Sequence, residues 1–203
     1  IMWWHNVQSL ISEWIMVQTG AVDARARMLS LPEELIGDAV RFVACHEVGH
    51  SLGLRHNMIA SAAYPTDSLR SATFTSRMGG TSASIMDYAR FNYVAQPGDG
   101  VKVMSPGIGP YDLMAIEWGY RWYPYGTDET QALADFLAQH QGKEYRYSET
   151  QPQRTAIDPR ALSEDLGDDP IRSATLGVEN LKRVMPNLVN WTRNGKPDQN
   201  FDE

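Results

Sequence analysis

The stretch "HEVGHSLGLRH", residues 46–56, decides how the chain is interpreted, because it gathers three of the five histidines around one glutamate. On an α-helix, residues four positions apart lie on one face, so His46 and His50 can direct their imidazoles at a common point. Two such histidines supply half of the tetrahedral nitrogen set that zinc favours. Glu47 lies about 100° further round the helix, where it is better placed to reach a metal-bound water than the metal itself.

The residues after this pair argue against two solvent-facing histidines on a charged helix face. Gly53 is expected to end the helix, because glycine enters the left-handed conformation without a steric cost. His56 follows three residues later and can complete a set of three histidines. A fourth position then stays open for water, which indicates a catalytic site, since structural zinc sites are closed and usually contain cysteine. The H-E-x-x-H pattern itself is that of zinc peptidases, with the glutamate as general base.

Further along the chain, two segments extend this pattern. Residues 46–56 resemble the metzincin signature H-E-x-x-H-x-x-G-x-x-H, with every fixed position present. "SASIMDY", residues 82–88, resembles the tight turn that places a methionine, here Met86, beneath the metal. "GPYDLMAIEWGY", residues 109–120, resembles the helix that closes the metzincin C-terminal subdomain.

The resemblance implies a role for each of these side chains. His46, His50 and His56 would bind Zn²⁺, and Glu47 would take a proton from a zinc-bound water and deliver it to the departing amine. Tyr88 would be a weak fifth ligand or a hydrogen-bond donor to the oxyanion, or else a tyrosine packed under the cleft floor. The methionine of the turn is expected to pack rather than to bind zinc.

Two positions depart from the astacin pattern. Asp87 stands where astacins have histidine, and Asn57 stands where they have glutamate, so the chain is not expected to be an astacin and the role of Tyr88 is in doubt. Cys45 is expected to be a small buried apolar residue.

A narrower resemblance extends over nearly the whole chain. Residues 41–58, 82–99, 109–118 and 163–188 resemble the EcxA-like metzincin domain of large bacterial zinc-dependent metalloproteases. This implies a piece of a longer, exported polypeptide acting in the periplasm, the cell envelope or outside the cell.

The same resemblance implies the fold class and the division of the chain. We expect an α+β metzincin-like catalytic domain, mostly helical in this piece, with the N-terminal sheet subdomain largely absent. "IMWWH", residues 1–5, would be its last strand. Residues 1–125 would form the catalytic core, and residues 126–203 would form a helical C-terminal extension packed on it.

Hydrophobic periodicity supports a mainly helical piece. It predicts helices over residues 7–20, 31–50, 109–120, 128–141 and 176–192. The first would start from an Asn6 cap, and the last would be bent at Pro186. Residues 57–110 are expected to be irregular, and residues 142–173 are expected to be an extended connection.

Composition narrows the class of protein. The chain has 203 residues and a net charge of −7, which argues against a nucleic-acid partner. A single cysteine excludes an internal disulfide, and no stretch approaches the ~20 apolar residues of a membrane span. The acidic stretch "SEDLGDD", residues 163–169, would be a solvated loop or, alternatively, a calcium site.

Three functions are compatible with these patterns. A zinc endopeptidase acting on protein or peptide substrates is the leading one. A zinc-binding scaffold or binding module without turnover is the second, and a hydrolase of non-peptide amides is the third.

Overall fold

The computed structural model describes residues 5–149 and 158–193. The α-helices within these ranges are α1 His5–Thr19, α2 Glu33–Ser51, α3 Ala72–Met78, α4 Pro110–Tyr120, α5 Glu129–Ala138, α6 Pro170–Val184 and α7 Leu188–Thr192. Short 3₁₀ turns connect them at Ala24–Ala26, Ser61–Ala63, Thr66–Arg70, Lys143–Tyr145 and Met185–Asn187. The mainly helical prediction is therefore confirmed for the described ranges.

The described ranges contain no β-strand, so the strand part of the predicted α+β class and the missing sheet subdomain both stay predictions. Of the predicted strand 1–5, only His5 lies within these ranges, and it begins α1 instead. The helix starts early enough that Asn6 lies inside it, where its side chain accepts a hydrogen bond only from its neighbour Val7. The predictions of a strand at His5 and of a cap at Asn6 are thus wrong.

The two N-terminal helices bury their apolar faces against each other. Six residues form the buried core here: Ile11, Ile15, Ala26, Leu31, Ala39 and Phe91. Each large side chain buried in this way contributes about 1.5–3 kcal/mol, so the contact fixes α2 firmly at its N-terminal half. Pro32 precedes the first turn of α2, and Glu33 and Glu34 favour the positive end of the helix dipole.

The segment between α2 and α4 is mostly irregular, as predicted, but it contains α3, which was not expected. Ser71 caps α3 by accepting a hydrogen bond from the Phe74 N–H, and Gly79 ends it in the left-handed conformation. A second core lies beneath this segment, formed by Ala60, Tyr64, Leu69, Ala83, Ala89, Val94 and Leu166. An irregular chain thus surrounds a well-packed interior.

Helix α6 starts six residues earlier than predicted. Asp169 caps its first turn by accepting from the Arg172 N–H, and Pro170 occupies the first helical position. The predicted interruption at Pro186 is confirmed, because a 3₁₀ turn separates α6 from α7 there.

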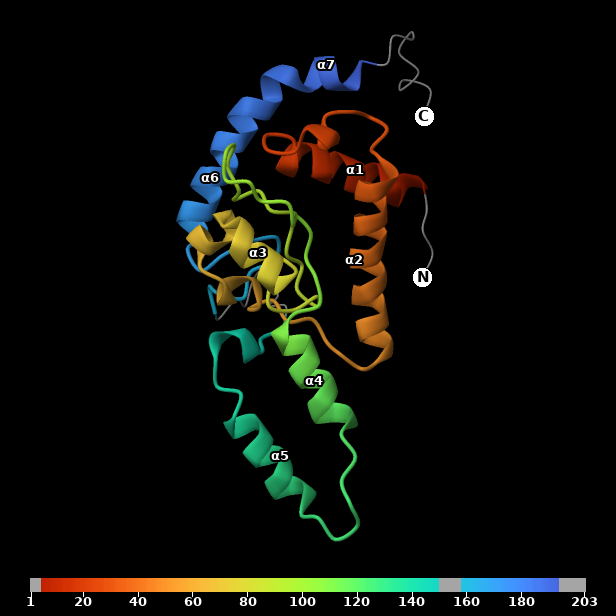
Figure 1. Cartoon of the computed structure of the whole chain (residues 1–203), viewed down its shortest axis with the longest axis vertical. Helices are drawn as coiled ribbons and strands as arrows, with labels where there is room; N and C mark the ends of the chain where they lie inside the picture. The colour runs from red at the N-terminus through yellow and green to blue at the C-terminus, as the bar shows by residue number, and fades with distance from the viewer. Residues whose placement is uncertain (1–4, 150–157, 194–203) are drawn as a thin grey trace.

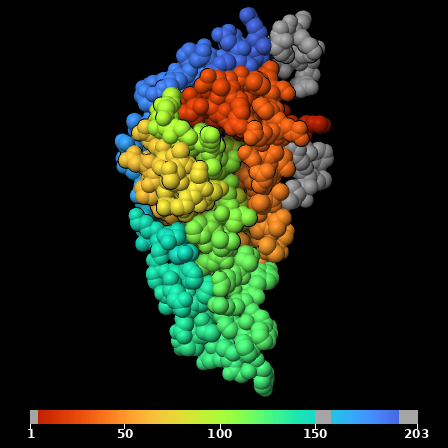
Figure 2. Space-filling view, viewed as in Figure 1, coloured from red at the N-terminus to blue at the C-terminus, as the bar shows by residue number. Residues whose placement is uncertain are grey.

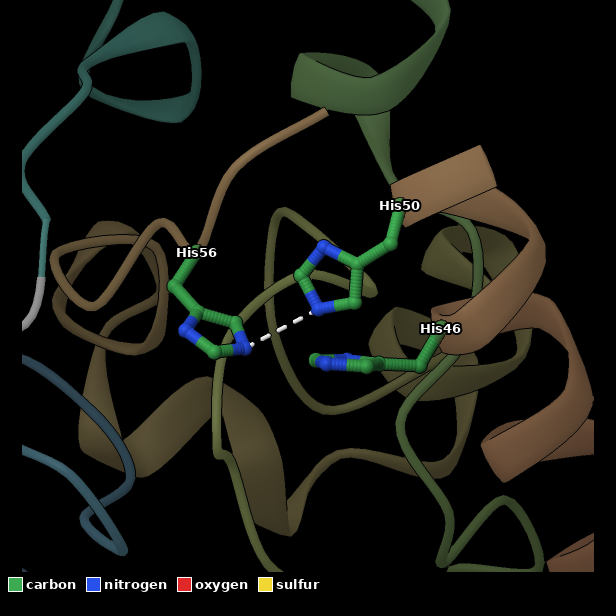
Figure 3. Close-up of side chains that lie close together, drawn as sticks. All are labelled: His46, His50 and His56. Carbon is green, nitrogen blue, oxygen red and sulfur yellow. Dashed lines mark hydrogen bonds between the residues drawn. The ribbon is translucent and has the colours of Figure 1, made fainter. Parts of the chain in front are cut away.

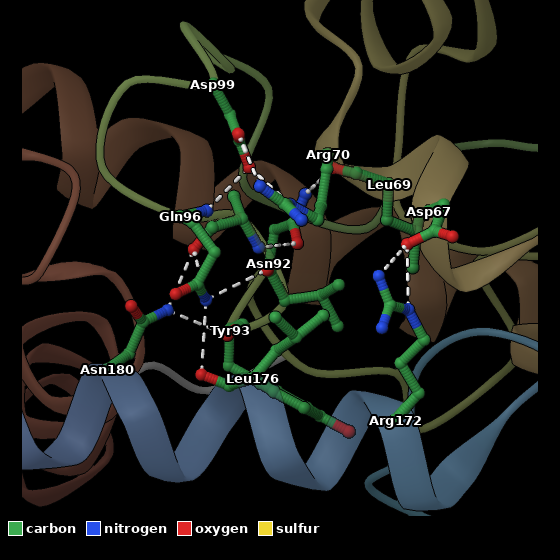
Figure 4. Close-up of polar contacts among 12 residues, drawn as sticks. Asp67, Leu69, Arg70, Asn92, Tyr93, Gln96, Asp99, Arg172, Leu176 and Asn180 are labelled. Atoms are coloured by element: carbon green, nitrogen blue, oxygen red, sulfur yellow. Dashed lines mark hydrogen bonds and ion pairs between the residues drawn. The ribbon is translucent and has the colours of Figure 1, made fainter.

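Polar side chains attach α6 to the irregular segment (Figure 4). Asn180 donates from Nδ2 to the carbonyls of Tyr93 and Ala95, and Gln96 donates to the carbonyl of Leu176. Arg172 pairs with Asp67 nearer the start of the helix. The part of the chain after residue 126 is therefore bound to the part before it, and the predicted boundary between 1–125 and 126–203 stays a prediction.

The molecule is elongated, with α1, α6 and α7 at one end and α4 and α5 at the other (Figure 1). Helix α2 runs along one side, and the segment from α4 to α5 forms the narrow end in the space-filling view (Figure 2). None of the helices in the described ranges is both long and apolar enough to cross a bilayer.

Candidate metal centre

The last two turns of α2 bring two histidines to one face of the helix. His46 is buried, and its ring lies 4.8 Å from that of His50, measured between ring centroids. The spacing of four residues places both rings on the side of α2 that faces the irregular segment (Figure 3). This part of the arrangement follows from local sequence alone.

A glycine turn then brings the third histidine back to the pair. Gly53 has φ +88°, and its N–H donates to the carbonyl of His50, while the Leu54 N–H donates to the carbonyl of Gly49. These two bonds are those of a Schellman motif, which reverses the chain directly after a helix. His56 consequently lies beside α2, with its Nε2 atom 3.1 Å from Nε2 of His50 (Figure 3).

Backbone carbonyls hold two of the three rings. Nδ1 of His46 lies 2.7 Å from the Ile85 carbonyl, and Nδ1 of His50 lies 2.9 Å from the Leu54 carbonyl. A carbonyl oxygen only accepts, so Nδ1 carries the proton in both rings and the Nε2 lone pair is left free. This is the tautomer that a metal bound at Nε2 requires.

The three histidines fit a tetrahedral ion. One ring nitrogen from each of His46, His50 and His56 lies within 4.8 Å of the other two. Two ligands about 2.05 Å from zinc at tetrahedral angles are about 3.3 Å apart, close to the 3.1 Å observed between His50 and His56. The donor set is three imidazoles without a cysteine, which suits zinc and supplies three of its four positions.

The protonation of these rings favours metal binding near neutral pH. Burial lowers the pKa of His46, although the hydrogen bond to Ile85 and the charge of Glu47 oppose this effect. Burial also lowers the pKa of His56, with further contributions from the neighbouring His46 and His50. Neutral imidazoles are the forms that bind metal.

The predicted methionine turn lies directly under the helix. Met86 is fully buried, and a Cβ atom built at Gly49 would come within 2.4 Å of its sulfur. A side chain at this position would collide with the Met86 side chain, so the glycine leaves room for that side chain against α2. Met86 therefore packs against the helix, as expected.

Asp112 fixes the turn from the other side, a role that no motif in the sequence predicts. It is buried, and its carboxylate accepts hydrogen bonds from the N–H groups of Ile85 and Gly109 and from the hydroxyl of Ser84. Burial raises the pKa of Asp112, and these hydrogen bonds oppose the rise. Because Ile85 also accepts from His46, Asp112 is connected to that ring through one residue. An aspartate three residues after Gly109, at the start of a helix with Pro110, was the signal available in the sequence.

Glu47 and Tyr88 both lie near the three imidazoles. Glu47 is exposed on α2, and its charge acts on both His46 and His56. The Tyr88 ring lies 4.6 Å from that of His56 and 5.7 Å from that of His46, measured between centroids. With 38% of its surface exposed, Tyr88 borders the site rather than lying buried beneath it.

Cys45 lies on a different face of α2. It is half-buried rather than buried as predicted, and with Val48, Leu52 and Leu113 it lines an apolar hollow of about 360 Å³ between α2 and α4. Cys45 is next to His46 in the chain but lies about 100° away around the helix, so it is not part of the three-histidine cluster.

The acidic stretch 163–169 is bound to the rest of the protein at several points. Asp165 accepts from the Ser61 hydroxyl, Asp168 accepts from the Thr66 N–H, and Glu164 pairs with Arg90. In the described ranges, the three histidines form the one group of three or more metal-binding side chains close enough to share an ion.

Asp87, which marks the difference from astacins, is buried beside this stretch. One of its carboxylate oxygens accepts from the Ser61 N–H, and the other has no hydrogen-bond partner among the described residues. Burial raises the pKa of Asp87 well above its usual range, and the nearby Asp165 adds to the rise.

Comparison with known protein families shows which family the chain belongs to. A family model described as Met-zincin matches residues 29–203. The chain belongs to the Met-zincin family. The predicted metzincin resemblance is thereby confirmed, and the match includes α2, the Met86 turn and the C-terminal helices. No curated protein and no solved structure matches the chain.

Proposed function

We propose that this Met-zincin is a zinc-dependent endopeptidase. The observation that carries the proposal is the convergence of three imidazole nitrogens within 4.8 Å, two of them held by backbone carbonyls in the metal-binding tautomer. A three-histidine set leaves a fourth position for solvent or substrate, which is the pattern of catalytic rather than structural zinc. When bound, zinc would lower the pKa of a coordinated water and polarise a peptide carbonyl.

The residues of the chain have distinct parts in this proposal. His46, His50 and His56 would hold the ion. Glu47, exposed and electrostatically close to two of these rings, would accept a proton from water and pass it to the amine that leaves. Tyr88 would donate a hydrogen bond to the oxygen on which negative charge develops, or bind the ion weakly, since its ring borders His56.

The test is a Glu47→Gln variant assayed with a broad library of peptides. We expect zinc content equal to that of the wild type and no cleavage. Glu33→Gln is a matched control, because it removes an exposed glutamate from the other end of the same helix. Wild-type cleavage rates in the Glu47→Gln protein would refute the proposed mechanism.

A second candidate is a zinc-binding scaffold or binding module, which would use the same three histidines without turnover. Zinc binding without turnover on any peptide, in this chain and in a longer parent protein, would select it. Cleavage of an amide other than a peptide bond, identified by mass spectrometry of the products, would select the third candidate.

The narrower EcxA-like resemblance supports two further proposals. The chain would work as part of a longer bacterial polypeptide, and that polypeptide would act after export, in the periplasm, the cell envelope or outside the cell.

A further inference from the structure

Asn57, the residue after the third histidine, joins three separate segments of the chain. It is fully buried, its Nδ2 donates to the Arg146 carbonyl at 2.9 Å, and its Oδ1 accepts from the Ser148 N–H at 3.0 Å. Its own N–H donates to the carbonyl of Met86 at 3.0 Å. The side chain thus reaches a segment about 90 positions away in sequence, while its backbone is bonded to the methionine turn.

The neighbouring residue extends this connection. The Met58 N–H donates to the Ser148 carbonyl at 2.8 Å, so residues 57–58 and 146–148 are paired by both backbone and side-chain bonds. Buried amides satisfied on both sides in this way are costly to remove, because each lost partner leaves another polar group unpaired.

The segment bonded to Asn57 also carries polar side chains to the edge of the site. Glu149 accepts from the Tyr147 hydroxyl at 2.6 Å and pairs with Arg55 at 2.9 Å. The charge of Glu149 also acts on His56. Residues 146–149 therefore lie next to the third histidine, although they belong to the predicted C-terminal extension.

The third histidine differs from the other two in how it is held. His46 and His50 stand on a rigid helix, and each has Nδ1 bonded to a backbone carbonyl. His56 stands on a turn, and its Nδ1 makes no hydrogen bond to another residue in the described part of the chain. Its placement therefore depends on the backbone around it, which Asn57 fixes.

We propose that Asn57 is a positioning residue for His56, which makes residues 146–148 part of the metal centre. This inference rests on the proposed role of His56 as a zinc ligand. Residues that orient a ligand through a hydrogen bond typically change metal affinity by 10–100-fold when they are removed. We expect a change on the order of this range for zinc when the Asn57 amide is lost.

The test compares Asn57→Ala with Asn92→Ala. Asn92 is an equally buried asparagine that also joins two segments, through Nδ2 to the Leu69 carbonyl and Oδ1 from the Ala95 N–H, but it lies away from the histidines. Zinc affinity is measured by competition with a chelator, and the stability of the metal-free protein is measured by thermal unfolding. Both variants should unfold at lower temperature, but only Asn57→Ala should bind zinc about 10–100-fold more weakly.

A spectroscopic readout separates positioning from general destabilisation. With Co²⁺ in place of zinc, the visible absorption should change in Asn57→Ala and stay as in the wild type in Asn92→Ala. If Asn57→Ala does not fold, Asn57→Ser keeps a polar group at this position but is too short to bond both the Arg146 carbonyl and the Ser148 N–H, and it should weaken zinc binding in the same direction. Wild-type zinc affinity in the folded variant would overturn the inference, whereas absence of zinc from the wild type would overturn the proposed function itself.

Discussion

The two halves of the metal centre are built in different ways. His46 and His50 are placed by one helix, and their spacing of four residues is sufficient to bring them together. His56 is placed by a turn, and that turn is held by hydrogen bonds to Met86 and to residues 146–148. One half therefore depends on local geometry, while the other depends on contacts between distant parts of the chain.

The largest expected effect on zinc affinity comes from removing one of the two histidines that α2 positions. His50→Ala removes one of three proposed ligands, so zinc affinity should fall by on the order of a thousandfold or more. His140→Ala is a matched control, because its Nδ1 also bonds a backbone carbonyl, that of Phe136, outside the cluster. Metal content measured after dialysis should be lost in the first variant and kept in the second. Equal zinc content in both would show that His50 does not bind the ion.

A smaller effect is expected where the local half meets the long-range half. Asp112→Ala leaves three donors on Ser84, Ile85 and Gly109 without their buried acceptor, which should cost about 3–5 kcal/mol of the free energy of unfolding. Zinc affinity should also fall, because Ile85 holds His46. Chemical denaturation of the metal-free protein measures the first effect. A loss below about 1 kcal/mol would mean that water replaces the carboxylate.

Two glycines of α2 allow a tightly packed position and an open position to be compared within a single helix. Gly49→Ala would place a Cβ atom 2.4 Å from the Met86 sulfur and should destabilise the protein by about 1–3 kcal/mol. Gly37→Ala meets no atom within 4 Å and should stabilise the helix by up to about 1 kcal/mol. Thermal unfolding of both variants checks the pair. A neutral Gly49→Ala would show that the Met86 side chain moves aside without cost.

The smallest effect concerns Asp165, a half-buried acid that accepts a hydrogen bond from the Ser61 hydroxyl. Burial raises the pKa of Asp165 to about 6. Between about pH 4 and 6 the unfolded chain releases this proton first, so the free energy of unfolding should fall with rising pH, by about 1–2 kcal/mol after solvent screening.

Asp165→Asn cannot ionise at this position and should reduce this pH dependence, while the other buried acids, Asp87 and Asp112, keep their contributions. Asp168→Asn removes the same formal charge from the same stretch and is the control for the change in net charge. Denaturation curves at several pH values measure both variants. Identical slopes in all three proteins would mean that Asp165 ionises in the folded state as it does in the unfolded chain.

The same division explains what could be predicted from the sequence. The end of α2 at Gly53 and the histidine pair follow from spacing and from the conformational freedom of glycine. The starts of α3 and α6 were missed although Ser71 and Asp169 are ordinary capping residues, because the surrounding Gly, Pro and Ser favoured loops.

The role of Asn57 could not have been predicted in this way. Its partners Arg146 and Ser148 follow α4 and α5 in the chain, and no local pattern specifies which distant carbonyl a buried amide will reach. Asp112 is intermediate, since its position at a helix start was visible but its bond to Ile85 was not. Hydrogen bonds from side chains to backbone groups distant in the sequence hold the part of the site that hydrophobic periodicity does not predict.

The paired residues 57–58 and 146–148 also suggest where the protein tolerates engineering. They tie together the two ends of the stretch that contains α4, α5 and the connection between these helices, residues 121–128. That connection is strongly solvent-exposed, as Trp122 and Tyr125 show, and lengthening a surface loop costs little conformational entropy. A fluorescent label inserted there would sit at the narrow tip of the molecule, outside the segments that position the three histidines.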